Sequence, residues 1–140
     1  MIIQQQTGFS TTAIAVPDRA RDPNDLAMTN VTVRNNSIYF GAGVPGGTGV
    51  LLGGEGTGHV SVSNAVHYAG ASANFGCFDY PLAAASYAAI NHNACRHLVG
   101  DWVRTRGALA AWQASSGFDP NSVAGDPQYT NPLGPAFDLR

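Results

Sequence analysis

The sequence predicts an all-β domain in which short strands stack coil upon coil as a solenoid. Three observations predict this class: a sequence repeat, period-2 alternation of apolar residues within it, and abundant turn-forming residues. Glycine and proline number 17 and 8 of the 140 residues, so turns are frequent and long helices few. A chain of this length is the size of one domain and buries roughly 70% of its unfolded surface.

Two strand-like stretches, 30–35 and 59–64, carry the repeat and align at an offset of 29. Valines at alternate positions coincide in this register, and the stretches end in Asn35 and Asn64. Alternation with period 2 is typical of a half-buried strand. We therefore expect the valines of both stretches to face the core. We also expect the asparagines of successive coils to hydrogen-bond one another at one corner.

The third copy of the repeat fits two registers. An offset of 29 aligns Asn93 with Asn64 but turns Ile90 outward, whereas an offset of 28 buries Ile90 and moves Asn93 out of the asparagine column. Between the first two copies, the apolar run 49–53 predicts another short strand, so each unit holds at least two strands. An ordinary β-sandwich with two similar hairpins is the alternative architecture.

The remaining chain is expected to complete one domain around these repeats. Residues 1–27 are interpreted as an N-terminal cap or first partial coil, 28–97 as the coils, and 98–140 as a helical turn and covering tail. Apolar residues between Leu98 and Gln113 recur at roughly helical spacing, which predicts one short helix or irregular helical turns. The chain then becomes rich in proline and aspartate, as expected of a tail laid over a core.

Aromatic residues are expected to cover the core. Both tryptophans, Trp102 and Trp112, lie in the segment with helical spacing, so we expect them to be largely buried. A second group lies between the repeats, where exposed rings would stack on sugars and buried rings would cover a flank of the solenoid. We favour burial for this group, which comprises Phe75, Phe78, Tyr80 and Tyr87.

Charge and composition argue against several classes of function. Only 11% of residues are charged, the net charge is −2, and all seven basic residues are arginine. The absence of lysine excludes Schiff-base chemistry and the phosphate-binding P-loop. No concentrated basic surface indicates nucleic acid as a partner. No apolar run approaches the roughly 18 residues of a membrane span, and the first residues carry no signal-peptide pattern.

The two cysteines leave two interpretations open. Cys77 and Cys95 form one disulfide if the protein is exported, or two small buried thiols if it is not. Their spacing, and that of the four histidines, does not match a zinc motif. We therefore expect no metal site from the residues themselves.

The closing pattern resembles a known family. The stretch 30–36, its copy at 59–64 and the pattern W-Q…G-F-D-P-N-S…D-P…F-D-L over 112–139 are similar to the last coils of bacterial pectate-lyase-like proteins. The resemblance covers about residues 28–140. It implies a short right-handed parallel β-helix with a short helical segment and a Pro-rich C-terminal tail. It also implies an extracellular or cell-surface location, and calcium as the cofactor of the family's lyases.

The resemblance implies a fold more than an activity. Enzymes of this family are several times longer than this chain, and their catalytic groups lie on middle coils that this chain lacks. Glycoside hydrolysis needs two carboxyl groups facing one bond, and Glu55 and Asp79 are the best candidates by elimination. Glu55 lies among glycines at 53–56, whose missing side chains would leave room for a ligand. An exposed turn residue is the simpler interpretation of Glu55.

A binding line is the second candidate site. Arg34, Ser63 and His92 follow one another at a constant offset of 29, and Arg34 faces outward if its valine neighbours face the core. Paired strands lie about 4.8 Å apart, so the first and last side chains would stand about 10 Å apart on one face. A guanidinium, a hydroxyl and an imidazole would suit an acidic sugar. Three solvated residues are the simpler alternative.

The predicted function is a non-catalytic or catalytically incomplete module that binds glycan or associates with itself. A small polysaccharide lyase or glycoside hydrolase is one alternative, and a purely structural assembly unit is another. We expect a homo-oligomer because an uncapped strand edge at residues 1–3 is followed by Gln4–Gln6, whose amides stack on copies of themselves. Pairing about a two-fold axis would close such an assembly.

Overall fold

A computed structural model describes residues 2–4, 8–17 and 27–128, and its strands form three parallel sheets. The five-stranded sheet has the order β1 (Ile2–Gln4), β4 (Ser37–Phe40), β7 (Ala65–Tyr68), β10 (Ala94–Arg96) and β12 (Val123–Ala124). The four-stranded sheet has the order β11 (Asp101–Val103), β8 (Phe75–Asp79), β5 (Gly47–Leu52) and β2 (Thr11–Val16). The three-stranded sheet has the order β3 (Thr32–Arg34), β6 (His59–Val62) and β9 (Tyr87–Asn91). Two helices complete the described elements, the 3-10 helix η1 (Ala84–Ser86) and the α-helix α1 (Leu109–Ser116).

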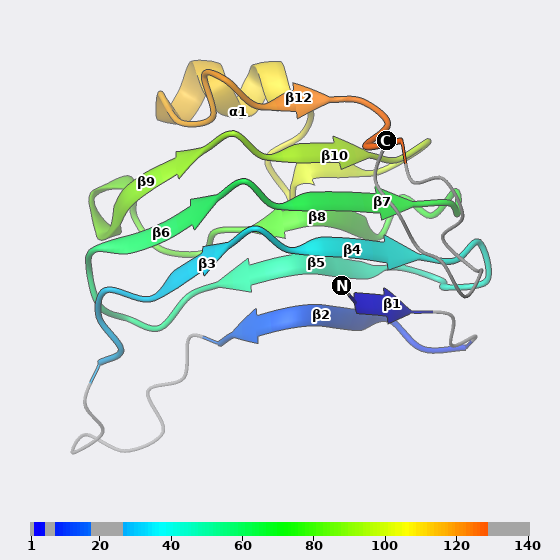
Figure 1. Ribbon diagram of the computed structural model, residues 1–140, viewed down its shortest axis with the longest axis horizontal. Helices are drawn as coiled ribbons and strands as arrows, with labels where there is room; N and C mark the ends of the chain where they lie inside the picture. The colour runs from blue at the N-terminus through cyan, green and yellow to red at the C-terminus, as the bar shows by residue number, and fades with distance from the viewer. Residues whose placement is uncertain (1, 5–7, 18–26, 129–140) are drawn as a thin grey trace.

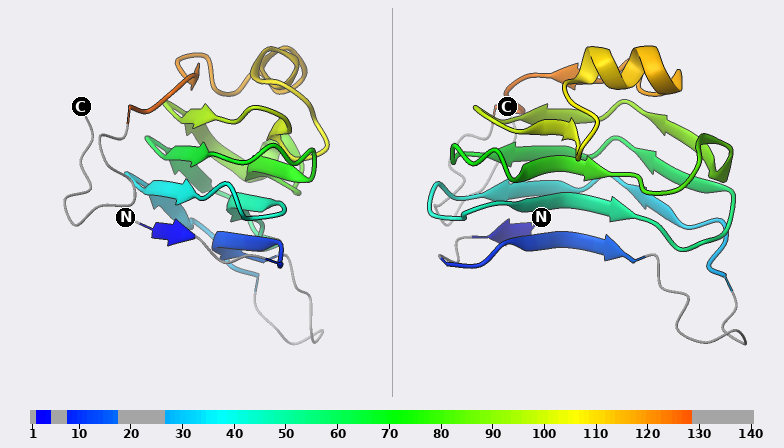
Figure 2. Two further views of the ribbon diagram at one scale, coloured as in Figure 1. Left: turned by 90° about the vertical axis from the view of Figure 1, so that its right-hand side faces the viewer. Right: turned by 180° about the vertical axis from the view of Figure 1, so that it is seen from behind.

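Strands that follow one another along the chain belong to different sheets, and each pairs with its counterpart from a later stretch. Figure 1 shows β3–β4, β6–β7 and β9–β10 as rows one above another, with β5 and β8 behind them. The views of Figure 2 show α1 and β12 above the stack of rows, beyond β9–β10, and β1 and β2 below it, beyond β3–β4. Apolar side chains from all three sheets meet between them and form one buried core.

The predicted fold class, a short right-handed parallel β-helix, is corrected by this arrangement. The described residues form three small sheets of separate strands with one α-helix, and no single solenoid is shown. The reason is local, because turns divide each stretch into short strands that pair only within their own sheet. The 1–27 segment, expected as a cap or partial coil, supplies β1 and β2 to two of the sheets. Residues 1, 5–7, 18–26 and 129–140 lie outside the description, including the end of the closing pattern and Met1, Gln5 and Gln6 of the expected oligomer edge.

The strand register differs by one residue from the repeat alignment. Val33 pairs with Ser61 rather than Val62, so the offset between the first two copies is 28. Ser61 pairs in turn with Ile90, an offset of 29. Val33, Ser61 and Ile90 are all buried, whereas the valines of β6 are only half-buried. The expectation that the valines of the second copy face the core is therefore wrong.

A column of asparagines explains this register. The amide oxygen of Asn64 accepts hydrogen bonds from the backbone N–H and the side-chain amide of Asn36, at 3.3 and 2.9 Å. The amide oxygen of Asn93 accepts the same two bonds from Asn64, at 3.0 and 3.2 Å. The predicted asparagine contacts are thus present, but Asn36 belongs to the column in place of Asn35. The residue before each member, Asn35, Ser63 or His92, has a φ of 56°, which turns the corner.

Asp119 closes the asparagine column at the end covered by α1. Its carboxylate accepts hydrogen bonds from the side-chain amide of Asn93 at 3.0 Å and from the Ser122 hydroxyl. The indole N–H groups of Trp112 and Trp102 donate to the other oxygen at 2.9 and 3.4 Å. Both tryptophans are buried, as predicted. The segment that carries them forms β11 and then α1, so the predicted short helix is present but begins only at Leu109.

The aromatic group between the repeats is buried, which confirms the expectation that its rings cover the core. Tyr80 donates a hydrogen bond to Ser61 at 2.8 Å, and Tyr87 donates one to the carbonyl of Leu52 at 2.9 Å. Each buried phenol therefore has a partner, as burial of a polar group requires. Phe75 and Phe78 complete this buried group. Among the described residues, no helix has the length and hydropathy to cross a membrane.

Candidate functional site

The structure does not align the predicted binding line as one column. Arg34 pairs with Val62, and Val62 pairs with Asn91. Ser63 and His92 each follow one residue later, at the left-handed corners. All three side chains of the predicted line are exposed, but the strand pairing shifts Arg34 by one position from the other two. Binding by these residues stays a prediction, without the geometry that suggested it.

The two candidate catalytic carboxylates belong to different pairings. Asp79 lies at the end of β8 opposite Leu51 of β5. Glu55 follows four residues after Leu51 and forms an isolated bridge with Met28. Gly56, next to Glu55, is required by the packing of the chain. A Cβ at this position would lie 2.0 Å from the carbonyl oxygen of Met28. The register places Glu55 four residues beyond the partner of Asp79, and the space beside Gly56 is taken by the Met28 carbonyl. Catalytic roles for Glu55 and Asp79 stay predictions.

Two arginines of one turn lie beside Asp79. The guanidinium of Arg104, just after β11, donates a hydrogen bond to the Thr48 hydroxyl in β5 at 3.3 Å. A Cβ at Gly76 would stand 2.9 Å from the Cβ of Arg104, so the glycine is what lets Arg104 cross β8. The guanidinium carbon of Arg106 lies 5.6 Å from the ring centre of Trp112, in the range of a cation–π interaction. We call Thr48, Asp79, Arg104 and Arg106 the arginine face.

The arginine face carries two guanidinium groups and only one carboxyl group, that of Asp79. Burial raises the pKa of Asp79, and the positive charges of Arg104 and Arg106 oppose that rise. In the part of the chain that the structure describes, ion pairs within 4.0 Å involve only Asp126, with Arg96 and His67. Both arginines are exposed, and neither has a carboxylate within 4.0 Å among the described residues. An anion at this face would meet two guanidinium groups that fit carboxylates bidentately.

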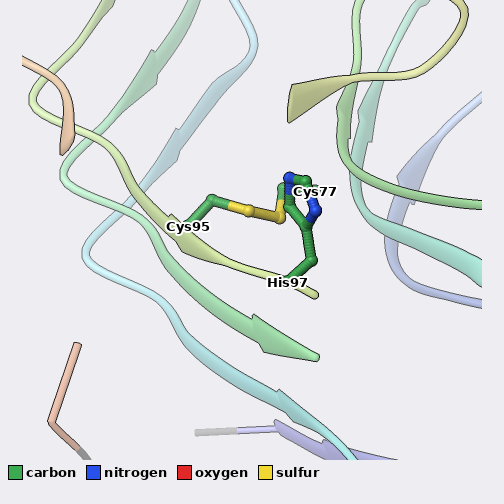
Figure 3. Close-up of side chains that lie close together, drawn as sticks. All are labelled: Cys77, Cys95 and His97. Carbon is green, nitrogen blue, oxygen red and sulfur yellow. A yellow bond between two sulfur atoms is a disulfide. The ribbon is translucent and has the colours of Figure 1, made fainter. Parts of the chain in front are cut away.

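A second site joins two sheets through sulfur. Cys77 of β8 and Cys95 of β10 form a disulfide across the core, with their Cα atoms 6.1 Å apart, which settles the choice between disulfide and thiols. His97 follows β10, and its imidazole lies against the disulfide (Figure 3). One ring nitrogen and the two sulfur atoms lie within 4.8 Å of one another. Burial lowers the pKa of His97, and the nearby Asp101 opposes this effect.

A pocket opens beside this sulfur–imidazole cluster. Its volume is about 180 Å³, and Cys95, His97, Trp102 and Leu109 are among its lining residues. The strands β10, β11 and β12 and the start of α1 thus surround it. The Nδ1 atom of His97 is buried and finds no hydrogen-bond partner within the described chain. The pocket is therefore lined in part by His97, whose Nδ1 atom is itself enclosed by the protein.

The calcium implied by the resemblance does not fit these residues. Calcium takes six to eight oxygen ligands. Within the described ranges, the one cluster of three or more metal-ligating residue types is Cys77, Cys95 and His97. Its sulfur and nitrogen donors suit softer cations than calcium.

Sequence patterns missed both sites for different reasons. The pair Arg104 and Arg106 is visible as R-T-R, but only the strand pairing places it near Asp79. The cluster of Cys77, Cys95 and His97 is spread over two strands and the turn after them, and no short motif contains it. Such a cluster depends on which strands of two sheets face one another across the core.

Comparisons with known proteins add no relative. No protein-family model, no curated protein and no solved structure matches the chain. The resemblance to the pectate-lyase-like family thus stays a prediction from the closing pattern. Any functional conclusion for this chain rests on the arginine face and the sulfur–imidazole cluster themselves.

Proposed function

We propose that the chain is a non-catalytic module that binds an acidic carbohydrate through the arginine face. The observation that carries the proposal is the pair of exposed guanidinium groups, on Arg104 and Arg106, with no carboxylate at ion-pair distance in the described chain. Bidentate pairing with a uronate carboxylate would use both planar groups. Trp112 packs against Arg106, and Thr48 accepts a hydrogen bond from Arg104. These contacts restrict both side chains in advance, so less side-chain entropy is lost on binding.

The placement of the two candidate carboxylates argues against hydrolysis as the primary activity. Two carboxyl groups about 5–10 Å apart are required across a glycosidic bond, whereas Asp79 pairs with Leu51, four residues before Glu55. Asp79 next to two arginines keeps a small lyase as the alternative, because a base beside guanidinium groups could remove a proton from a uronate. Release of an unsaturated uronate product, followed by its ultraviolet absorbance, would replace the binding proposal with the lyase.

The binding proposal is tested by titrating an oligogalacturonate into the protein in a calorimeter, with an uncharged oligosaccharide of similar length as the comparison ligand. We expect only the acidic ligand to bind, with affinity that falls as salt rises. The variants Arg104→Ala and Arg106→Ala should each weaken binding about tenfold, or about 1.4 kcal/mol. Arg34→Ala, which removes an exposed arginine on β3, is the matched control.

The outcomes separate the two candidate surfaces. Loss of binding in Arg104→Ala and Arg106→Ala, with Arg34→Ala unchanged, supports the arginine face. Loss in Arg34→Ala alone would transfer the function to the predicted line with Ser63 and His92. Equal binding by the parent and the Arg104→Ala/Arg106→Ala double variant would reject the arginine face.

Self-association is a second candidate function, favoured by strand β2. Within the described residues β2 pairs only with β5 and forms the end of its sheet. Its six residues carry no charge, and charged edge residues are a usual defence against pairing with another chain. We propose that β2 pairs with β2 of a second copy. One chain has a mass of 14.5 kDa, and light scattering should then give twice that mass.

An edge substitution tests this pairing. Ala15 is exposed on β2, so Ala15→Lys should restore the mass of a single chain. Ala110→Lys, at an exposed position of α1, is the control and should keep the dimer. A parent that shows the single-chain mass at every concentration would exclude the dimer, and a dimer that persists in Ala15→Lys would place the interface elsewhere.

A further inference from the structure

Cys77, Cys95 and His97 bring together three residues of the types that bind metal ions. While the two sulfurs are joined in the disulfide, they cannot act as thiolate ligands. We propose that reduction of Cys77–Cys95 opens a site for one Zn²⁺ ion, held by both thiolates and the imidazole of His97. This inference is independent of the arginine face.

Geometry is the first argument. The two sulfur atoms and one imidazole nitrogen already lie within 4.8 Å of one another. Zn–S bonds of about 2.3 Å in a tetrahedral site place two thiolates about 3.8 Å apart. The Cα atoms of Cys77 and Cys95 are 6.1 Å apart on two different sheets. The sulfurs can thus separate to the required distance by side-chain rotation, and β8 and β10 need not move.

The imidazole supplies the second argument. The Nδ1 atom of His97 is buried with no hydrogen-bond partner in the described part of the chain. A buried polar atom without a partner costs free energy, so the imidazole has bonding capacity that the described chain does not use. The side chain itself lies against the sulfurs, as the close-up in Figure 3 shows.

The pocket supplies the third argument. A tetrahedral zinc with three protein ligands takes water or a small ligand in the fourth position. The pocket of about 180 Å³ that Cys95 and His97 line has room for such a ligand, because a single water needs only about 10–15 Å³ of comparable volume. It also gives the ion a path to the cluster.

The chemistry balances with a thiol reductant. Two electrons and two protons pass from two reductant thiols to the S–S bond, which gives two cysteine thiols and one reductant disulfide. Zn²⁺ then replaces the two thiol protons, and these are released to solvent. A disulfide oxidant would reverse the process: it takes two electrons from the two thiolates and two protons from solvent, becomes two thiols, and the reformed Cys77–Cys95 bond releases the ion. The cluster would thus bind metal in one redox state only.

Cobalt(II) is the probe for the first experiment, because it replaces zinc and absorbs light. The full chain is reduced with a phosphine, which becomes phosphine oxide with oxygen from water and does not itself supply a thiol ligand. We expect one equivalent of Co²⁺ to produce thiolate-to-cobalt charge-transfer bands and visible bands of tetrahedral cobalt, and Zn²⁺ to abolish them. The oxidised chain should show none of these bands.

Variants assign the ligands. Cys95→Ser should remove most of the charge-transfer absorbance, and His97→Ala should weaken cobalt binding about tenfold or more, the loss seen even when partners outside the ligand set are removed. His92→Ala, at an exposed corner, is the control and should bind as the parent does. Absence of thiolate bands in the reduced parent, or His97→Ala with unchanged affinity and spectrum, would overturn the proposal.

Thermal unfolding keeps the test decisive if reduction loosens the fold. Zn²⁺ should raise the Tm of the reduced chain and leave the oxidised chain unchanged, since a ligand of the folded state stabilises it by mass action. If the reduced chain is unfolded, zinc should restore its circular dichroism. A reduced chain that stays unfolded with saturating zinc would count against the site.

Discussion

Asp119 connects the asparagine column to both tryptophans, and its replacement should be among the most damaging single changes in the molecule. The side chain is fully buried and accepts bonds from Asn93, Ser122, Trp112 and Trp102. A hydrogen bond to a charged group contributes about 1.5–3 kcal/mol, and a buried donor left without a partner costs about 1–3 kcal/mol. Removal of the charge returns part of its desolvation cost. We therefore expect Asp119→Ala to lower the free energy of unfolding by about 3–5 kcal/mol.

The isosteric variant separates charge from shape. Asp119→Asn can keep one oxygen toward Asn93 and Ser122 but points amide N–H groups at the two indoles. We expect a loss of about 1–3 kcal/mol for this variant. Asp126→Asn, which removes an exposed carboxylate from its ion pairs with Arg96 and His67, is the control with an expected loss below about 1 kcal/mol.

Urea unfolding, followed by tryptophan emission and circular dichroism, measures these differences. The parent should emit at short wavelength and resist iodide, because Trp102 and Trp112 are 1% and 3% exposed, and Asp119→Asn should shift that emission. The reasoning is refuted if Asp119→Ala loses no more stability than Asp126→Asn. That result would mean that the indoles and the asparagine column find other partners without the carboxylate.

Three further predictions concern other parts of the structure. Asn64→Ala breaks the asparagine column in its middle and should cost about 1–3 kcal/mol in the urea assay; a loss like that of an exposed-loop substitution would contradict it. Reduction of the Cys77–Cys95 disulfide, which joins residues 18 apart, should cost about 3 kcal/mol without metal, and an unchanged Tm would oppose this. Burial lowers the pKa of His67 and His97 below the ordinary 6.5, so the unfolded chain binds protons first as the pH falls. Stability should therefore decline from pH 7 toward 5, less so in His97→Gln; an equal decline in that variant would remove His97 as a cause.

The sequence predicted local features of the fold well. Period-2 alternation located β3 and β6, and the spacing of Trp102 and Trp112 indicated buried cover at one end. The offset of 28 could not be read because Asn35 and Asn36 are identical, and either one can align with Asn64. Hydrogen bonding in three dimensions decides between them, because Asn35 takes the left-handed corner and leaves Asn36 for the column.

The candidate sites were less accessible to sequence reasoning. The line of Arg34, Ser63 and His92 depended on an offset of 29 between the first two copies, so an error of one residue displaced Arg34. A one-residue slip reverses the face on which every side chain of a strand lies. The fold class itself was wrong because alternation reports strands and turns, and it does not report how strands are divided among sheets.

The disulfide also has a mechanical consequence. A chain pulled from its two ends transmits force through the Cys77–Cys95 bond, so the residues between them bear no load while that bond is intact. A separation of 18 residues corresponds to about 60 Å of extended chain. The oxidised molecule should therefore extend about 60 Å less than the reduced one when fully stretched. Through this bond, the redox state of the surroundings sets how far the molecule can reach under tension.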